Sequence, residues 1–384
     1  MNKKIAVIMI LLIVMFLGFG IIIPILPEIV SAAHLAVMLA VYSAASFIMS
    51  PVWGGLSDRI GRKPVIVIGS LGFSVSFLLF GLFIDHLFWM YVSRLLGGLF
   101  SGAVISCAVA YVSDVTSEEE RTKAMGLVGM SIGIGFIFGP AVGGLLSYFG
   151  HATPFFIASA ISFFAFMLVL TRLDESLPAH ARRTDKAGRP SRWSAFTGRM
   201  KYLYMLAFIV SFTLAGLEAV LLYFQQERIG ATSFHFGMML LISGIVGASI
   251  QGGVVRRFIK KGDEPKFVLT GLILCALGYF LLLLSDRFLT ATLYLCIFSS
   301  GNALLRPCVT SLITQKTTVG QGVATGLSSS MDSLGRIIGP LLGASLFYIH
   351  SFLPFIVGGI VCLGSIGFLY RFLQLDRQHV AQKT

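Results

Sequence analysis

The chain has 384 residues, of which 56% are hydrophobic and 12% charged, with a net charge of +12 and a mean hydropathy of +0.88. A soluble protein of this length must present polar groups to water, so this composition excludes a soluble globular fold and indicates helices embedded in a lipid bilayer. The five cysteines are odd in number and all lie within apolar stretches. They are interpreted as small packing residues, and we expect neither a disulfide framework nor a metal or cofactor.

An α-helix needs about 20 apolar residues to cross a bilayer. Hydropathy predicts twelve spans in two sets of six, at 5–27, 34–56, 64–84, 88–112, 122–147 and 151–171, then 201–225, 234–258, 266–286, 289–314, 320–347 and 351–373. The first span follows Lys3 and Lys4, as the apolar region of a signal peptide would. Its apolar run is longer than such a region and leads directly into the second span, so we expect it to be retained.

The only long polar segment lies between the two sets of spans. It contains two prolines and many basic residues, without apolar periodicity, which is typical of a linker. The sequence therefore predicts an N-terminal six-helix half (1–171), a cytoplasmic linker (172–200) and a C-terminal six-helix half (201–384).

Most of the 29 Lys and Arg residues lie in the termini, in the linker and in the loops after even-numbered spans. The opposite loops carry only Arg228 and Arg287. By the positive-inside rule, both termini face the cytoplasm, and we expect a multi-pass protein of a bacterial cytoplasmic (inner) membrane. Because the basic residues are scattered over separate loops, no nucleic-acid partner is expected.

The two halves resemble each other in sequence. The stretch "GLVGMSIGIGFIFGPAVGG" (126–144) matches "GLSSSMDSLGRIIGPLLGA" (326–344) at 7 of 19 positions. Both stretches fall in the fifth span of their half. Chance alignment of glycine-rich helices is the alternative, but the shared Gly-Pro register favours a true repeat. Same-orientation repeats of six helices are the arrangement of major-facilitator transporters.

The string "GGLSDRIGRKP" (54–64) resembles the loop signature of the major facilitator superfamily, through Gly54, Gly55, Asp58, Arg59, Gly61 and Arg62. The paired glycines are expected to permit close helix contact, and Gly61 a tight turn. Asp58 is expected to pair with a cation or cap a helix, which would hold a cytoplasmic gate shut. The alternative is a basic loop that only sets topology.

The fifth span resembles the antiporter signature of this superfamily, through Gly135, Gly139, Pro140, Gly143 and Gly144. Missing side chains there are expected to allow close packing against the other half, and the proline to bend the helix. The stretch "LGFGIIIPILP" (17–27) and Arg94 in "SRLLGGLFSG" (93–102) resemble signatures of the twelve-helix drug:proton antiporters. Met15 stands where tetracycline exporters usually carry an acid, which argues against that subgroup.

One carboxylic acid lies inside the seventh span. Glu218 stands in "SFTLAGLEAVLLYF" (211–224), where it is the only charged residue. An acid at this depth generally faces a cavity and takes part in function. Because burial favours the protonated form of a carboxyl group, Glu218 is a candidate to exchange a proton for a lipophilic cation. The alternative is a structural acid, neutralised by an arginine or hydrogen-bonded across helices.

The stretch around Glu218 resembles the seventh helix of NorA-like and Bmr-like multidrug exporters, and that resemblance implies a functional acid at this place. It also implies a second acid, three residues before an Arg-Pro pair in the tenth helix. Here Arg306 and Pro307 are kept, but Ala303 takes the place of the acid. Asp332 in the eleventh span is a candidate substitute, unless it forms an internal ion pair with Arg336 one turn later.

Two arginines, Arg94 and Arg306, lie within predicted spans. Each is expected to steady a carboxylate, to hydrogen-bond to backbone carbonyls or to respond to protonation of a neighbour. A purely structural role is the alternative. Aromatic residues make up 12% of the chain and suit flat hydrophobic cations through stacking and cation–π attraction. Substrate contacts are predicted for Phe16, Tyr42, Phe136, Phe298 and Tyr223, although most aromatic residues in such a protein only pack or meet lipid.

These features favour a proton-coupled antiporter that exports varied lipophilic, often cationic drugs by alternating access. An exporter of one sugar, metabolite or lipid precursor with the same fold is the alternative, although the spans contain few amides to bind a polar substrate. An enzyme and an ATP-driven pump are disfavoured, because no H-E-x-x-H and no phosphate-binding loop occurs. The expected partners are drugs, protons and membrane lipid, and the protein is expected to be a monomer.

Overall fold

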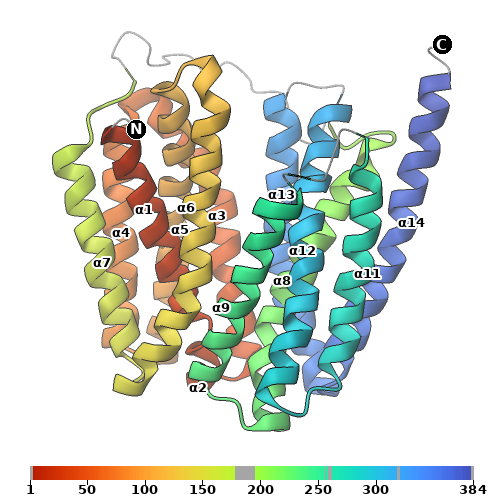
Figure 1. The fold of residues 1–384 in the computed structure, drawn as a ribbon. Helices are drawn as coiled ribbons and strands as arrows, with labels where there is room; N and C mark the ends of the chain where they lie inside the picture. The colour runs from red at the N-terminus through yellow and green to blue at the C-terminus, as the bar shows by residue number, and fades with distance from the viewer. Residues whose placement is uncertain (1–2, 178–194, 256, 258–261, 318–320, 382–384) are drawn as a thin grey trace. The chain divides into compact units, whose positions relative to one another are not determined.

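The computed structural model describes residues 3–177, 195–255, 257, 262–317 and 321–381, and this part of the chain is helical (Figure 1). The predicted spans coincide with long helices. The bounds are α1 (Lys3–Ile22), α2 (Leu26–Ile29), α3 (Ala32–Ile60), α4 (Arg62–Leu82), α5 (Leu87–Asp114), α6 (Glu118–Leu146), η1 (Ser147–Phe149), α7 (Thr153–Arg172), α8 (Met200–Ile229), α9 (Ser233–Ser249), the π-helical η4 (Ile250–Val255), α11 (Glu264–Leu282), α12 (Phe288–Lys316), α13 (Gln321–Ile349) and α14 (Leu353–Ala381).

Eleven of the described helical stretches are long and apolar enough to cross a membrane. The twelfth predicted span corresponds to α13, which has 29 residues and is therefore also long enough. It carries Asp332 and Arg336, and these charges lower its hydropathy. The fold is that of an all-helical, multi-pass membrane protein, as predicted.

The contacts divide the chain into two compact units. Unit 1 comprises residues 1–31, 41–187 and 233–241, and unit 2 comprises residues 32–40, 188–232 and 242–384. The start of α3 is thus grouped with unit 2, and the start of α9 with unit 1.

The two units use the same helix pairings. In unit 1, α1 packs against α6 and α7, and α4 packs against α5 and α7. In unit 2, α8 packs against α13 and α14, and α11 packs against α12 and α14. These pairs correspond one to one along the chain (Figure 1). The sequence repeat is therefore a structural repeat.

Glycines bring the fifth helix of each repeat close to the first. A Cβ added at Gly139 of α6 would lie 2.7 Å from the Leu17 oxygen and 2.8 Å from the Gly20 Cα of α1. A Cβ added at Gly335 of α13 would lie 2.6 Å from the Phe212 nitrogen of α8. Small residues at such contacts let membrane helices approach closely.

The prediction that the fifth-helix signature packs against the other half is therefore wrong for Gly135, Gly139 and Gly143, which all meet α1 of their own unit. Gly144 is different, because it meets the backbone of Ser233 at the start of α9. Pro140 lies inside α6, and a bilayer tolerates such a proline where neighbouring helices cover the freed backbone groups. The motif is a helix-packing device within one unit.

Candidate functional site

Glu218 lies on α8, in unit 2, and is half-buried. Within the described part of the chain, no hydrogen bond or ion pair is formed by its carboxylate. The positive charges of Arg336 and Arg306 nevertheless act on it. Glu218 is thus a carboxylate near two guanidinium groups but fixed to neither.

Asp332 on α13 has fixed partners. The Ser211 hydroxyl of α8 donates a hydrogen bond of 2.8 Å to Asp332 Oδ1. Arg306 of α12 places Nη2 at 3.6 Å from Asp332 Oδ2. The side chains of Arg306 and Asp332 are 46% and 28% exposed, so this ion pair is partly open to its surroundings.

The alternative that Asp332 pairs internally with Arg336 is not what the structure adopts, since Asp332 reaches across to α12 instead. Two acids and two arginines from α8, α12 and α13 form one cluster in unit 2, which we call the acid cluster: Glu218, Asp332, Arg306 and Arg336. Sequence reasoning missed Ser211, although it precedes Glu218 by two helical turns on the same face.

In unit 1, aromatic rings from three helices form a contiguous group. Phe16 lies 5.0 Å from Phe136, measured between ring centroids. Phe19 lies 5.5 Å from Phe136 and 5.2 Å from Tyr42. The structure therefore brings together Phe16, Tyr42 and Phe136, and it adds Phe19, which joins Tyr42 to the other two. Phe19 follows Phe16 by three residues, a spacing that places both on one face of α1.

Arg94 on α5 is buried and held by rings. Its guanidinium carbon lies 4.9 Å from the centroid of Phe80, 5.7 Å from that of Phe77 and 5.9 Å from that of Tyr42. Its Nε has no hydrogen-bond partner, and no carboxylate in the described ranges pairs with it. Cation–π contacts thus replace the expected carboxylate partner of Arg94.

Two further aromatic candidates lie elsewhere in unit 2. Phe298 is fully buried between α12 and α11, where its ring lies 5.2 Å from that of Tyr279. Gly278 of α11 lies against the backbone and Cβ of Phe298. Because Phe298 is fully buried, its expected substrate contact is not supported. Tyr223 is half-buried on α8, with its ring 6.2 Å from that of Phe347.

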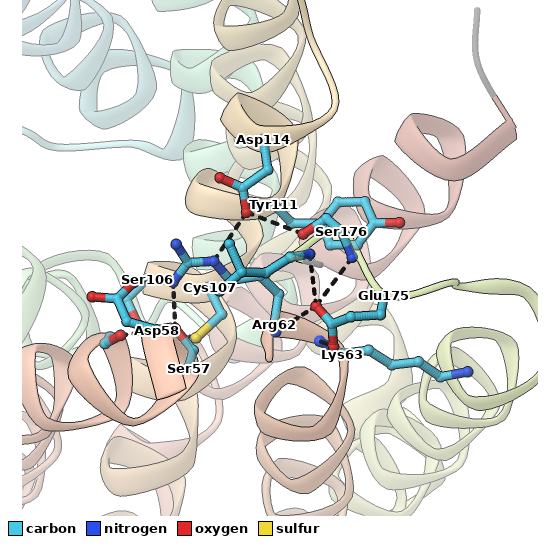
Figure 2. A network of polar contacts seen from close by, with 12 residues as sticks. Ser57, Asp58, Arg62, Lys63, Ser106, Cys107, Tyr111, Asp114, Glu175 and Ser176 are labelled. Carbon is cyan, nitrogen blue, oxygen red and sulfur yellow. Dashed lines mark hydrogen bonds and ion pairs between the residues drawn. The ribbon is translucent and has the colours of Figure 1, made fainter. Parts of the chain in front are cut away.

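The loop signature forms a polar network around Arg62, shown in Figure 2. The Arg62 Nη1 lies 2.6 Å from the Ser57 hydroxyl and 2.7 Å from Asp58 Oδ1. Its Nε lies 3.0 Å from Oδ2 of Asp114, at the end of α5. We call Ser57, Asp58, Arg62 and Asp114 the α3–α4 network. Charge-assisted hydrogen bonds of this kind are strong, and here they tie α3, α4 and α5 together.

Other residues of the signature have different roles from those expected. Gly61 adopts a φ of 107°, which confirms the tight turn. A Cβ added at Gly54 or Gly55 would meet nothing within 4 Å, so the expected close helix contact at these glycines is wrong. Arg59 is exposed at the end of α3.

All five cysteines are free, and four of them are buried. In the described ranges, no three His, Cys, Asp or Glu side chains come together as metal ligands.

A repeated bundle of membrane-spanning helices with ionisable side chains inside its spans defines a polytopic transporter. The chain belongs to the Major Facilitator Superfamily, whose family model matches residues 8–322. Multidrug resistance protein 2 of Bacillus subtilis (strain 168) is 35% identical over 367 residues, which cover 92% of this chain and 91% of that protein. Multidrug resistance protein 1 of the same strain is 32% identical over 365 residues, with 92% of each chain covered.

Quinolone resistance protein NorA of Staphylococcus aureus (strain N315) is 26% identical over 393 residues, which cover 100% of this chain and 98% of that protein. Among solved structures, the human organic anion transporter MFSD10 (TETRAN) has a TM-score of 0.74 at 23% identity, and the match covers 96% of this chain and 99% of that one. A mutant of the nucleoside transporter NupG has a TM-score of 0.75 at 14% identity, with 97% and 100% covered. These two structures show the fold.

Proposed function

We propose that this protein exports varied lipophilic, often cationic drugs in exchange for protons, by alternating access. Relatives that match over more than nine-tenths of the chain are named for multidrug or quinolone resistance, which supports drug export. In this proposal the protein is a monomer in a bacterial cytoplasmic membrane, with both termini and the linker on the cytoplasmic side.

The observation that carries the proposal is the contrast between the two acids of the acid cluster. Asp332 is fixed by Ser211 and Arg306, whereas no such contact in the described residues holds Glu218. A carboxylate without a fixed partner is available both to a proton and to a substrate cation. Competition for one acid couples the two, because binding of one expels the other.

A transport cycle follows from this competition. A proton from outside neutralises Glu218 and releases the drug, and loss of that proton inside restores the carboxylate for the next drug. Aromatic contacts to a flat hydrophobic substrate are proposed within each unit. In unit 1 these are Phe16, Phe19, Tyr42 and Phe136. In unit 2 the proposed contact is Tyr223. The α3–α4 network would act as a gate that must rearrange in each cycle.

The test is ethidium accumulation in proteoliposomes whose lumen is more acidic than the medium. We expect wild type to accumulate ethidium until nigericin collapses the pH difference. Glu218→Gln keeps the shape of the side chain but cannot ionise, and its gradient-driven accumulation is expected to fall at least about tenfold, as for loss of an essential proton-transfer group. Glu227→Gln is the matched control, since Glu227 is an exposed acid on the same helix.

Equal transport by wild type and Glu218→Gln would show that Glu218 is structural. If wild type moves no ethidium while the gradient holds, the multidrug proposal fails, and export of one sugar, metabolite or lipid precursor becomes the better hypothesis. Loss of transport in Glu227→Gln as well would indicate a general effect of removing charge from α8.

A further inference from the structure

A short segment after α7 contacts the α3–α4 network. We call residues 173–177 the strap. The Tyr111 hydroxyl of α5 donates a 2.9 Å hydrogen bond to the Asp174 carbonyl oxygen. The Ser176 hydroxyl lies 3.1 Å from Asp114 Oδ2, the same oxygen that accepts from the Arg62 side chain. The strap is therefore bonded to α5 through both its backbone and a side chain.

Glu175 of the strap caps α4. Its Oε1 accepts a 2.7 Å hydrogen bond from the Arg62 backbone N–H, and its Oε2 accepts one of 3.1 Å from the Lys63 N–H. The first N–H groups of a helix have no partner within the helix, and the N-cap residue Gly61 has no side chain to offer. A carboxylate placed there satisfies these donors and complements the positive end of the helix dipole. This cap comes from a residue 113 positions away in the sequence.

The conformation of the turn before α4 leaves room for the Glu175 carboxylate. Gly61 has a φ of 107°, which side chains of L-residues rarely allow. A Cβ at Gly61 would also enter the space of the Glu175 carboxylate. The glycine therefore serves the contact as well as the turn.

We propose that Glu175 is a positioning residue for the α3–α4 network. Glu175 fixes the backbone of Arg62, and the guanidinium of Arg62 joins Asp58 and Asp114 (Figure 2). Glu175 also accepts hydrogen bonds from the N–H groups of Ser176 and Leu177, so its own place is fixed by the strap. The chain of contacts runs from the strap through the α4 backbone to the network.

The consequence for transport rests on the proposed function, in which the α3–α4 network acts as a gate. Loss of the cap lets the start of α4 shift and the network re-form in several arrangements. Turnover then falls, because the gate closes less often in its productive arrangement. The affinity for substrate is expected to stay the same, because Glu175 is bonded to the start of α4 and to the strap, away from the predicted aromatic contacts of unit 1.

Cys107 provides a readout that does not depend on transport. Its thiol is fully buried and lies beside Ser57 and Arg62 (Figure 2). In a variant whose other four cysteines are replaced by alanine, the rate of labelling by N-ethylmaleimide therefore reports how often the network opens. We expect Glu175→Gln to label about tenfold faster than its parent, as a lost helix cap would allow. Gly61→Ala is expected to do the same by displacing the carboxylate.

Transport is measured on the same variants, per folded protein, as ethidium turnover and KM. Glu175→Gln is expected to lower turnover about tenfold, with a KM within about twofold of the wild-type value. Glu175→Asp keeps a carboxylate and is expected to recover part of the lost turnover. Asp174→Asn is the matched control. Asp174 is the neighbouring acid; its exposed side chain pairs with Lys4, and the hydrogen bond to Lys4 lowers the pKa of the Asp174 carboxyl below its ordinary value.

Faster labelling and lower turnover in Glu175→Gln and Gly61→Ala, with Asp174→Asn like its parent, would support the proposal. Unchanged labelling and turnover, with only a lower unfolding temperature, would overturn it, as would a rise in KM that matches the fall in turnover. If wild type moves no ethidium, the labelling rates still decide whether Glu175 positions the network, and only the proposed function fails.

Discussion

At the scale of single residues, the two acids in the spans of unit 2 differ in what surrounds them. Asp332 accepts a hydrogen bond from Ser211 and pairs with Arg306. Glu218 is influenced by Arg336 and Arg306 without a bond to either among the described residues. If Arg306 is shared electrostatically by both acids, a change at Asp332 must reach Glu218.

Asp332→Asn tests this link. The substitution removes the carboxylate that pairs with Arg306. The positive charge of Arg306 then stabilises the ionised form of Glu218. Ethidium accumulation should consequently require a more acidic lumen than in wild type, which a series of lumen pH values would reveal. The Arg306–Asp332 pair is partly exposed and is worth at most about 1 kcal/mol to stability, so the variant should fold.

Ala303→Asp in the Asp332→Asn background is the matched rescue. It places an acid one turn before Arg306 on α12, where relatives of the NorA-like type carry one. The pH dependence should return toward that of wild type. No shift in Asp332→Asn, or no return in the double variant, would show that Arg306 does not link the two acids.

The sequence identified Glu218, Asp332 and Arg306 as the ionisable residues of interest, because charges stand out in apolar spans. It did not predict which arginine pairs with Asp332. Spacing within one helix favours Arg336. The observed partner, Arg306, lies on α12, and its approach to Asp332 depends on how the two helices pack, which the sequence does not show. Phe298 illustrates the same limit, since its ring packs against Tyr279 of another helix. The roles of these residues in proton coupling stay predictions.

At the scale of helices, the repeat places glycines along one face of α6 and of α13. Gly335 and Gly339 meet α8 as Gly135 and Gly139 meet α1. The sequence predicted that another segment comes close to these glycines. It assigned this contact to the other half, which is wrong for Gly135, Gly139 and Gly143, because a missing side chain carries no information about its neighbour.

Gly139→Ala should destabilise the α1–α6 contact, since its Cβ would lie 2.7 Å from the Leu17 oxygen. Overpacking of this kind costs about 1–3 kcal/mol, so the unfolding temperature in detergent should fall. Gly126→Ala is the control on the same helix, because a Cβ there meets nothing within 4 Å. It should leave the unfolding temperature unchanged or raise it slightly, as alanine favours a helix more than glycine does. Equal effects of both would contradict the packing role.

At the scale of the whole molecule, the number of membrane crossings decides where the two ends lie. Twelve crossings put both termini on one side, whereas eleven would put them on opposite sides. The sequence predicts twelve. In the structure, eleven of the described helices are long and apolar enough to cross a membrane, and the charged α13 makes the twelfth by its length. The boundaries of the halves at 171 and 201 stay a prediction.

Reporter fusions distinguish these numbers. Green fluorescent protein fused after residue 384, or before residue 1, should fluoresce in both cases, because it folds only on the cytoplasmic side. Alkaline phosphatase fused at the same places should be inactive. Fluorescence from only one of the two ends would indicate an odd number of crossings and would overturn the predicted topology.

The acid cluster has a consequence for the electrical side of transport. The charges of its two acids and two arginines sum to zero when both acids are ionised. Under the proposed exchange, a proton on Glu218 raises this sum by one, and so does a monovalent cation bound beside its carboxylate. The loaded cluster then carries the same charge in either direction, and one-for-one exchange moves no net charge across the bilayer.

A potassium–valinomycin potential should therefore leave proton–ethidium exchange unchanged, whereas an unequal exchange would gain or lose about 2.3 kcal/mol per charge at 100 mV. A clear response to that potential would contradict the one-for-one charge count.

For an uncharged drug the balance is lost, and each cycle carries one positive charge inward. The same four side chains would then make the exporter electroneutral for cations and voltage-driven for neutral compounds.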